Sequence, residues 1–260
     1  PVLRFLIEIG TVLLLIFVGG YTLNDFHGLW GLNQIPQGVA IPLTVFAAVG
    51  IINAINLIDG IDGLASGLCS IACLLYGLTF LMFHPHIYAM LAFATLGVLV
   101  PFFYYNVFGN AEHGKKIFMG DTGSLTVGMM LCLLSLKLTM CGTDDNTVHI
   151  NPMVLAFSPL LIPCCDVVRV YLHRVRNGKN PFLPDKNHIH HKLLAVGMQQ
   201  RSVMIIVISV STVFILFNIL LSLYLNVNWI VLVDILIWTF TNIRLTKRIG
   251  QLQSRQATNK

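Results

Sequence analysis

Eight long apolar segments leave few folds open to this chain of 260 residues. They run over residues 5–22, 41–58, 67–83, 87–107, 125–140, 152–172, 203–224 and 229–243. Backbone polar groups cannot stay unpaired in lipid, so apolar segments of this length cross a bilayer as helices. Only 10% of the residues are charged, against roughly 25% in soluble domains. We therefore predict an all-α fold, a polytopic membrane bundle of about eight transmembrane helices.

Lysine and arginine are unevenly distributed among the connections between these segments. All of the 16 except Lys137 lie in or beside one alternate set: the chain start, 59–66, 110–124, 173–202 and the tail from 244. Positive residues are retained on the cytoplasmic side, so this set should face the cytoplasm. We expect one transmembrane domain, residues 1–243, and a basic cytoplasmic tail, 244–260. The net charge of +5 then reflects topology and contact with membrane lipid, and no nucleic-acid partner is expected.

The end of the second apolar segment carries a row of polar residues, Asn53, Asn56, Asp59 and Asp62. A step of three rotates a helix by roughly 60° from the last position, so neighbours in the row share a face. A carboxylate at the centre of a bilayer helix costs roughly 2.5–3.5 kcal/mol, so such residues usually mark a site. Their oxygens suit a hard cation or the edge of a sugar or base. A merely polar helix end is the alternative, but the helix dipole disfavours aspartate there.

A second cluster, Gly120-Asp121-Thr122-Gly123-Ser124, directly precedes another apolar segment. Asp121 or Thr122 could simply cap the helix that begins there. The free N–H groups of a helix start also bind anions, and the flanking glycines would let a phosphate approach. Lys115 and Lys116 add positive potential nearby. A functional Asp121 is the favoured interpretation.

The connection 173–202 carries four histidines among several basic residues. Basic residues alone would serve topology, but that role does not require His188, His190 and His191 within four positions. Zinc is conceivable, yet no cysteine or further ligand stands at a supporting spacing. Contact with phosphate, or acid–base work, suits histidines in so basic a setting.

All three clusters fall on the side that we expect to be cytoplasmic, which indicates one composite site at the membrane face. Acids and amides for a divalent cation, a glycine-flanked aspartate and a basic loop with histidines are the equipment for phosphoryl transfer. Nucleotide-activated donors are found in the cytoplasm. The place of the site at the lipid boundary favours a lipid as the second substrate.

Three stretches, 53–65, 118–124 and 184–191, resemble the polyprenyl-phosphate N-acetylhexosamine-1-phosphate transferases, in the WecA/TagO-like branch of glycosyltransferase family 4. The resemblance extends over essentially the whole chain, with the motifs in order. It implies transfer of a sugar-1-phosphate from a UDP-sugar to undecaprenyl phosphate, with release of UMP, at the start of cell-envelope polysaccharide synthesis. It also implies a multi-pass protein of the bacterial inner membrane with its active site facing the cytoplasm, and a homodimer is compatible with it.

Matching the family motifs residue by residue assigns roles within this chain. The ligands of Mg²⁺, with Mn²⁺ as an alternative, would be Asn56 and Asp121. Catalytic roles, in orienting the donor or stabilising charge, fall to Asp59, Asp62, His188, His190 and His191. Substrate-binding roles fall to Asn53, Lys116, Arg174 and Arg176.

One family feature is not found in this chain, a pair of aspartates at the cytoplasmic end of an earlier span that is often assigned to activation of the lipid phosphate. We therefore expect an N-terminally truncated sequence, and one alternative is an inactive fragment. Another is a phospho-N-acetylmuramoyl-pentapeptide transferase, which has the same chemistry and a bulkier donor.

Two other classes fit less well. A CDP-alcohol phosphatidyltransferase needs Ala-Arg at a fixed offset after its Asp-Gly motif, whereas Leu64-Ala65-Ser66 follow Asp62-Gly63 here. A transporter would hold its polar residues near the middle of the membrane. Within the spans, Asp166 lies near a proline-interrupted stretch, and Asp234 has no obvious partner.

Overall fold

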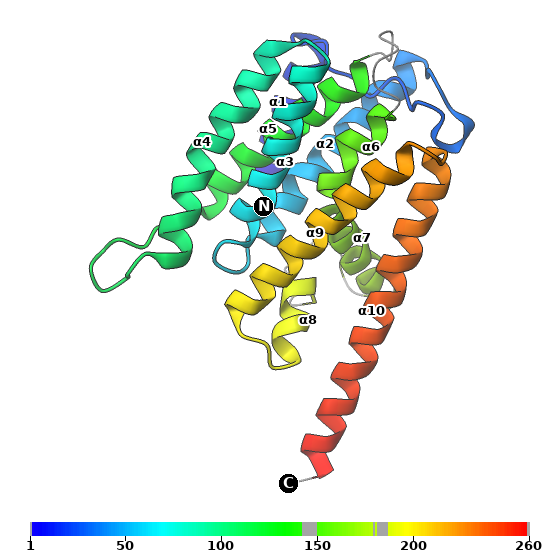
Figure 1. Ribbon diagram of the computed structural model, residues 1–260. Coiled ribbons are helices and arrows are strands. Elements are labelled where there is room, and N and C mark those ends of the chain that lie inside the picture. The colour runs from blue at the N-terminus through cyan, green and yellow to red at the C-terminus, as the bar shows by residue number, and fades with distance from the viewer. Residues whose placement is uncertain (1, 142–149, 179, 181–186, 259–260) are drawn as a thin grey trace.

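The computed structural model describes residues 2–141, 150–178, 180 and 187–258, which form a bundle of helices (Figure 1). Among these residues, seven spans are long and apolar enough to cross a membrane. They are α2 (Gln37–Ile58), α3 (Leu64–Met82), α4 (His86–Phe108), α5 (Gly120–Met140), a broken helix made of α6 (Pro152–Phe157), η2 (Ser158–Leu160) and α7 (Leu161–Arg176), then α9 (Gln200–Ser222) and α10 (Val227–Thr258). The same residues contain one isolated β-bridge, between Asp25 and Gln34. The predicted all-α membrane bundle is confirmed.

The first of the eight expected spans, predicted over residues 5–22, is a shorter helix in the structure. Helix α1 (Val2–Phe17) has 16 residues, which reach roughly 24 Å and fall short of the ~30 Å hydrocarbon core of a bilayer. Two glycines follow its end. Gly20 has a φ of 72°, and a Cβ at Gly19 would lie 2.6 Å from the ring of Tyr21. Because a side chain fits poorly at either position, the chain turns here instead of continuing the helix.

The connections alternate between the two ends of the bundle, as the topology predicts (Figure 1). One end, called the motif end here, carries residues 59–63, 109–119 and the segment with α8 (Ile189–Ala195). The opposite end carries residues 18–36 with η1 (Leu29–Gly31), and the turns before α4 and α10. The polar clusters of the sequence therefore gather at one end of the molecule.

Helix α3 forms the centre of the bundle. Its side chains Tyr76 and Phe80 are fully buried, and the Tyr76 hydroxyl donates to the carbonyl of Ala156 in α6 at 2.6 Å. Helices α4, α9 and α10 lie further out and expose large apolar side chains such as Ile87, Leu216 and Ile235. Lipid takes the place of water around such a bundle, so apolar side chains on the outside are expected.

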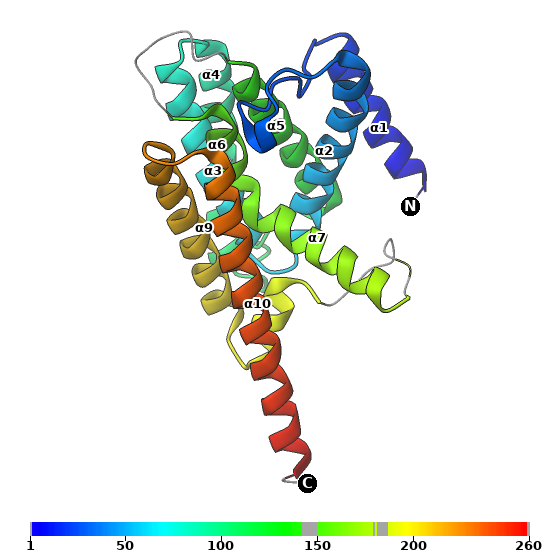
Figure 2. The same ribbon diagram turned by 90° about the vertical axis from the view of Figure 1, so that its right-hand side faces the viewer.

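The span between α5 and α9 is broken at η2. Pro159 and Pro163 lack the N–H groups that a continuous helix uses, so the segment changes direction. Beyond the break, α7 runs sideways, away from α9 and α10 (Figure 2). This direction brings Asp166 and Arg169 of α7 to the start of α8.

Two boundaries differ from the prediction and matter for the site. Helix α5 begins at Gly120, so the Gly-Asp-Thr-Gly-Ser cluster is the first turn of the helix and not part of a loop before it. Helix α10 continues to Thr258, so the described part of the basic tail extends the last span as a helix. The first five residues of α5 are polar or glycine, so hydropathy alone placed the start of this helix at residue 125.

Candidate active site

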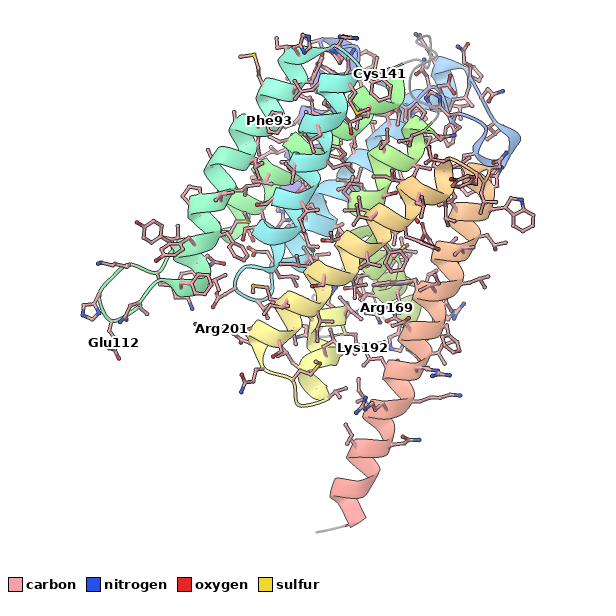
Figure 3. All side chains as sticks on the ribbon, viewed as in Figure 1. Phe93, Glu112, Cys141, Arg169, Lys192 and Arg201 are labelled. Atoms are coloured by element: carbon pink, nitrogen blue, oxygen red, sulfur yellow. The ribbon has the colours of Figure 1, made fainter. Side chains whose placement is uncertain are left out.

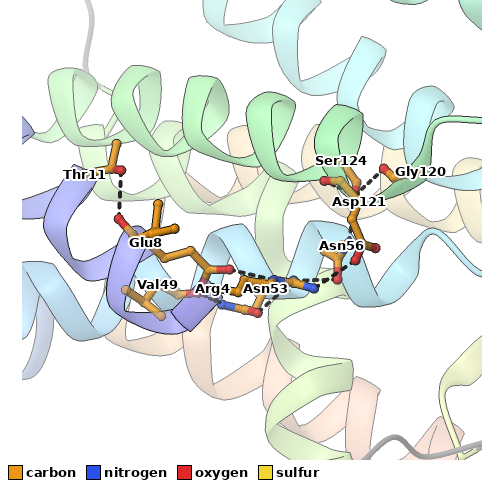
Figure 4. Close-up of polar contacts among 10 residues, drawn as sticks. Arg4, Glu8, Thr11, Val49, Asn53, Asn56, Gly120, Asp121 and Ser124 are labelled. Carbon is orange, nitrogen blue, oxygen red and sulfur yellow. Dashed lines mark hydrogen bonds and ion pairs between the residues drawn. The ribbon is translucent and has the colours of Figure 1, made fainter. Parts of the chain in front are cut away.

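Arg4 of α1 lies at the centre of a polar cluster that joins three helices (Figure 4). Its guanidinium donates to Asn56 Oδ1 at 2.8 Å, and to Asn53 Oδ1 and Asp121 Oδ2 at 3.3 Å each. Glu8, one turn further along α1, accepts from Arg4 Nε at 2.9 Å. One cation therefore gathers oxygens from α2 and α5, the helices that carry the first two sequence clusters.

Asn56 and Asp121 also bond to each other. Asn56 Nδ2 donates to Asp121 Oδ1 at 3.1 Å and to Ser124 Oγ at 2.8 Å. Asp121 stands in the first turn of α5, where the helix dipole favours a carboxylate, and its side chain is 74% exposed. The N-cap residue of α5 is Met119, so Asp121 does not cap the helix. The structure thus brings together the two residues predicted to share a metal ion and leaves one of them open to a ligand.

Asp59 is the C-cap residue of α2 and stands close to two other acids. Burial, reinforced by the negative charges of Asp62 and Asp121, raises the pKa of Asp59 to about 6. The helix dipole also disfavours a carboxylate at this end of α2. Acids held this close repel one another, so the cluster favours a bound cation or a proton.

Asp62 forms an ion pair with Lys116. The sequence motifs assign a catalytic role to Asp62 and a substrate-binding role to Lys116. Lys116 Nζ lies 2.6 Å from Asp62 Oδ2, and both side chains are partly exposed. Asn106, at the end of α4 and buried, connects the same two loops. It accepts from Gly63 N at 2.6 Å and donates to the carbonyl of Ile117 at 2.7 Å. This amide fixes the spacing of the loops that present Asp62 and Lys116.

The histidine segment, residues 187–192, is bound at its start by a carboxylate of α7. Asp166, which is 1% exposed, accepts from His188 Nδ1 at 2.9 Å and from the backbone N–H of Ile189 at 3.0 Å. Arg169 pairs with Asp166 at 2.7 Å and also donates to the carbonyl of Asn187. Figure 3 places Arg169 at the motif end, with Lys192 of α8 below it. The two residues of α7 tie the start of α8 to the bundle.

His190 is buried against the turn that follows α2. A Cβ on Gly60 would lie 2.2 Å from His190 Nε2. The ring of His190 stacks on that of His188, with centroids 5.8 Å apart, and its centroid lies 4.2 Å from that of His191. Burial lowers the pKa of His190 to about 4, with the charges of the two neighbouring histidines adding to the effect, so His190 is neutral at pH 7. Within the described residues, neither of its ring nitrogens has a hydrogen-bond partner.

Arg174 and Arg176 occupy the last turn of α7. Arg174 Nη1 donates to the carbonyl of Asn180 at 2.8 Å. Figure 2 shows this end of α7 projecting sideways from the bundle, away from α8. The two arginines and the histidines therefore approach from different sides. Residues 184–186, the start of the third motif, lie outside the described residues.

Four residues of this cluster were not assigned from the sequence: Arg4, Asn106, Asp166 and Arg169. Arg4, Asp166 and Arg169 left a signal, because an ionised residue inside or beside an apolar helix needs a partner. Asn106 left none, since one amide at a helix end is common. The other acid within a span, Asp234, has its partner in the structure, because Asn218 Nδ2 donates to it at 2.8 Å.

The oxygens around Arg4 fit a hard divalent cation. Asn53, Asn56 and Asp121 already surround a positive charge, the guanidinium itself. Mg²⁺ is usually held by one or two carboxylates together with waters and substrate phosphates. In the described residues, no group of three or more His, Cys, Asp or Glu side chains could hold a metal. Asn56 and Asp121 therefore suit an ion that shares its coordination with a phosphate-bearing substrate.

A model of glycosyl transferase family 4 matches residues 1–139, which include Arg4, Asn56 and Asp121. The chain belongs to glycosyl transferase family 4. It is 33% identical over 212 residues to the probable undecaprenyl-phosphate N-acetylglucosaminyl 1-phosphate transferase of Bacillus subtilis (strain 168). It is 33% identical over 193 residues to the decaprenyl-phosphate N-acetylglucosaminephosphotransferase of Mycobacterium leprae (strain TN). It is 32% identical over 186 residues to the undecaprenyl-phosphate alpha-N-acetylglucosaminyl 1-phosphate transferase of Yersinia pestis.

These alignments cover 81%, 68% and 72% of this family 4 chain, in the same order. They cover 56%, 47% and 49% of the three relatives, so the chain spans about half the length of the curated relatives it matches. The family predicted from the three motifs is confirmed. With seven spans among its described residues, this family 4 member is a multi-pass membrane protein.

Proposed function

We propose that the protein transfers an N-acetylhexosamine-1-phosphate from a UDP-sugar to a polyprenyl phosphate and releases UMP. An oxygen of the acceptor phosphate forms a bond to the β-phosphorus of the donor, and the bond from that phosphorus to the bridging oxygen breaks. Relatives named for N-acetylglucosamine and for undecaprenyl or decaprenyl phosphate support this reaction over transfer of a muramoyl-pentapeptide. UDP-N-acetylglucosamine is accordingly the first donor to test.

The observation that carries the proposal is the convergence of Asn53, Asn56 and Asp121 on one cationic point at the motif end. Asn56 and Asp121 would hold Mg²⁺ or Mn²⁺, which when bound would neutralise charge on the phosphates of the donor. A donor diphosphate would offer Arg4 and Lys116 charged oxygens in place of their present partners Asp121 and Asp62. Both side chains can therefore turn from their acids and amides to phosphate oxygens, in charge-assisted hydrogen bonds.

The histidine segment supplies a different kind of contact. His190 is neutral at pH 7, so it adds no positive charge, but it can donate one hydrogen bond from its ring. It stands beside Gly60 and the acids that follow α2. We place the donor diphosphate between this histidine and the Arg4 cluster, and the lipid phosphate at the membrane boundary of the same end. The distribution of lysine and arginine supports a cytoplasmic position for this end.

The test uses membranes in which the complete reading frame containing this chain is expressed. UDP-N-acetylglucosamine labelled in the sugar is supplied with polyprenyl phosphate and Mg²⁺. We expect label in a lipid extract together with equimolar UMP, and no product without the lipid phosphate. Release of UDP in place of UMP, or transfer from UDP-N-acetylmuramoyl-pentapeptide alone, would contradict the proposal. A Glu112→Gln variant, changed at the tip of an exposed loop (Figure 3), is the matched control for acidic substitutions.

A further inference from the structure

We propose that Asp166 is a positioning residue that sets the tautomer of His188 and anchors the histidine segment, so that His190 is held against Gly60. The inference rests on the proposed function, because it gives a role to the histidines of that site. Nothing in the motifs assigns Asp166, which lies in α7 and apart from all three clusters in the sequence.

The carboxylate of Asp166 has no freedom to serve another partner. One oxygen accepts from Arg169 at 2.7 Å and the other from His188 Nδ1 at 2.9 Å, while Ile189 N–H reaches both at 3.0 and 3.1 Å. An ionised carboxylate can only accept hydrogen bonds, so His188 Nδ1 must carry a proton. In the neutral ring, Nε2 is then left as an acceptor. Carboxylates commonly fix the tautomer and orientation of functional histidines in this way.

The same contacts anchor the backbone. Ile189 is the first residue of α8, and Arg169 holds the carbonyl of Asn187 just before it. Residues 187–189 are therefore fixed at three consecutive positions to one turn of α7. The ring of His190 lies parallel to that of His188, with an angle of 4° between the planes. The anchor on α7 is thereby transmitted to the ring that packs on Gly60.

A second buried aspartate provides a matched control. Asp234 of α10 is 4% exposed, also lies within a span, and accepts from Asn218. Among the described residues, the hydrogen bond of Asp234 is to Asn218 of α9 and not to residues 187–192. An Asp234→Asn variant therefore measures the general effect of neutralising a buried acid in a span, while the contacts of Asp166 stay in place.

The experiment compares the wild type with Asp166→Asn, Arg169→Gln and Asp234→Asn, each in the complete protein in membranes. The first readout needs no activity: modification of histidines by diethyl pyrocarbonate, located by mass spectrometry. Exposed His84 and His86, at the opposite end of the bundle, serve as internal references. We expect Asp166→Asn to increase modification of His188 and His190 relative to these references, Arg169→Gln to do so less, and Asp234→Asn to leave it unchanged.

The second readout is the rate of transfer against donor concentration. We expect Asp166→Asn to lower kcat by at least about tenfold with little change in the donor KM.

Asparagine keeps the volume and an acceptor oxygen, so a purely space-filling role would leave kcat unchanged. Wild-type turnover in Asp166→Asn would overturn the inference, as would histidine modification equal to that of Asp234→Asn. If the wild type itself transfers nothing, the proposed function fails, and the modification pattern alone still decides whether Asp166 anchors the segment.

Discussion

The ring of His190 lies directly against the backbone of Gly60, so closely that a Cβ on the glycine would stand 2.2 Å from Nε2. The two residues belong to motifs separated by 130 positions of sequence, one in α8 and one in the turn after α2. Their contact joins the histidine segment to the acidic turn. It also explains why a glycine suits this position although its backbone does not require one.

We predict that Gly60→Ala lowers the rate of transfer by at least about tenfold, a loss typical of a displaced supporting group. The added methyl group would overlap the buried ring of His190, so the ring must move away from the turn after α2. The measurement is sugar-phosphate transfer in membranes, at expression matched to the wild type. Gly50→Ala in α2 is the control, because nothing lies within 4 Å of a Cβ there. Equal activity of the two variants would show that the contact between Gly60 and His190 does not affect transfer.

Removal of one metal ligand should show as a changed metal requirement. We predict that Asp121→Asn raises the Mg²⁺ concentration for half-maximal transfer by at least about tenfold, since loss even of an outer partner of a metal ligand costs that much. Chelation with EDTA should abolish transfer in the wild type, and added Mg²⁺ or Mn²⁺ should restore it. Glu112→Gln should keep the wild-type requirement. An Asp121→Asn protein with an unchanged Mg²⁺ titration would remove Asp121 from the metal site.

Much of the fold could be predicted from the sequence because a bilayer allows few solutions. Apolar length identified seven spans, and the alternation of lysine and arginine predicted which connections share an end. The exception was α1, where Gly19 and Gly20 end the helix although the apolar pattern continues. Hydropathy records composition along the chain, whereas this ending depends on the space around two positions.

The candidate site divides along a similar line. Residues concentrated in motifs, such as Asn56 and Asp121, could be predicted, and the structure brings them within hydrogen-bond distance. Arg4 and Asp166 could not be placed, because neither belongs to one of the three motifs and each reaches the site through contacts at long sequence separation. The break at η2 decides where Asp166 points, and the sequence shows the prolines but not the resulting direction.

The pKa of Asp59 leads to a prediction about stability. A folded-state pKa of about 6 lies above the ordinary value, so the protonated form stabilises the fold. This contribution is complete below about pH 4 and is lost as the pH rises through about 6. In EDTA, Asp59→Asn should therefore raise the melting temperature at about pH 8 more than at about pH 5. A pH-independent effect of Asp59→Asn would contradict the assignment.

Asn106 offers a separate test of how the site is built. Its side chain is buried, and it satisfies both the N–H of Gly63 and the carbonyl of Ile117. Asn106→Leu leaves both groups without that partner, and each such loss costs roughly 1–3 kcal/mol. We predict a lower free energy of unfolding, measured by SDS titration in mixed micelles, and a higher donor KM, because Lys116 stands next to Ile117.

Asn110→Ala is the matched control for this change. Asn110 lies in the same loop, and its side chain accepts from the backbone N–H of Glu112 at an exposed position. Its loss should change the free energy of unfolding by no more than about 0.5 kcal/mol, as is usual for surface substitutions. If Asn106→Leu were equally mild, the two loops would be held together by other contacts. A loss of stability with an unchanged donor KM would instead show that Asn106 supports the fold without setting the position of Lys116.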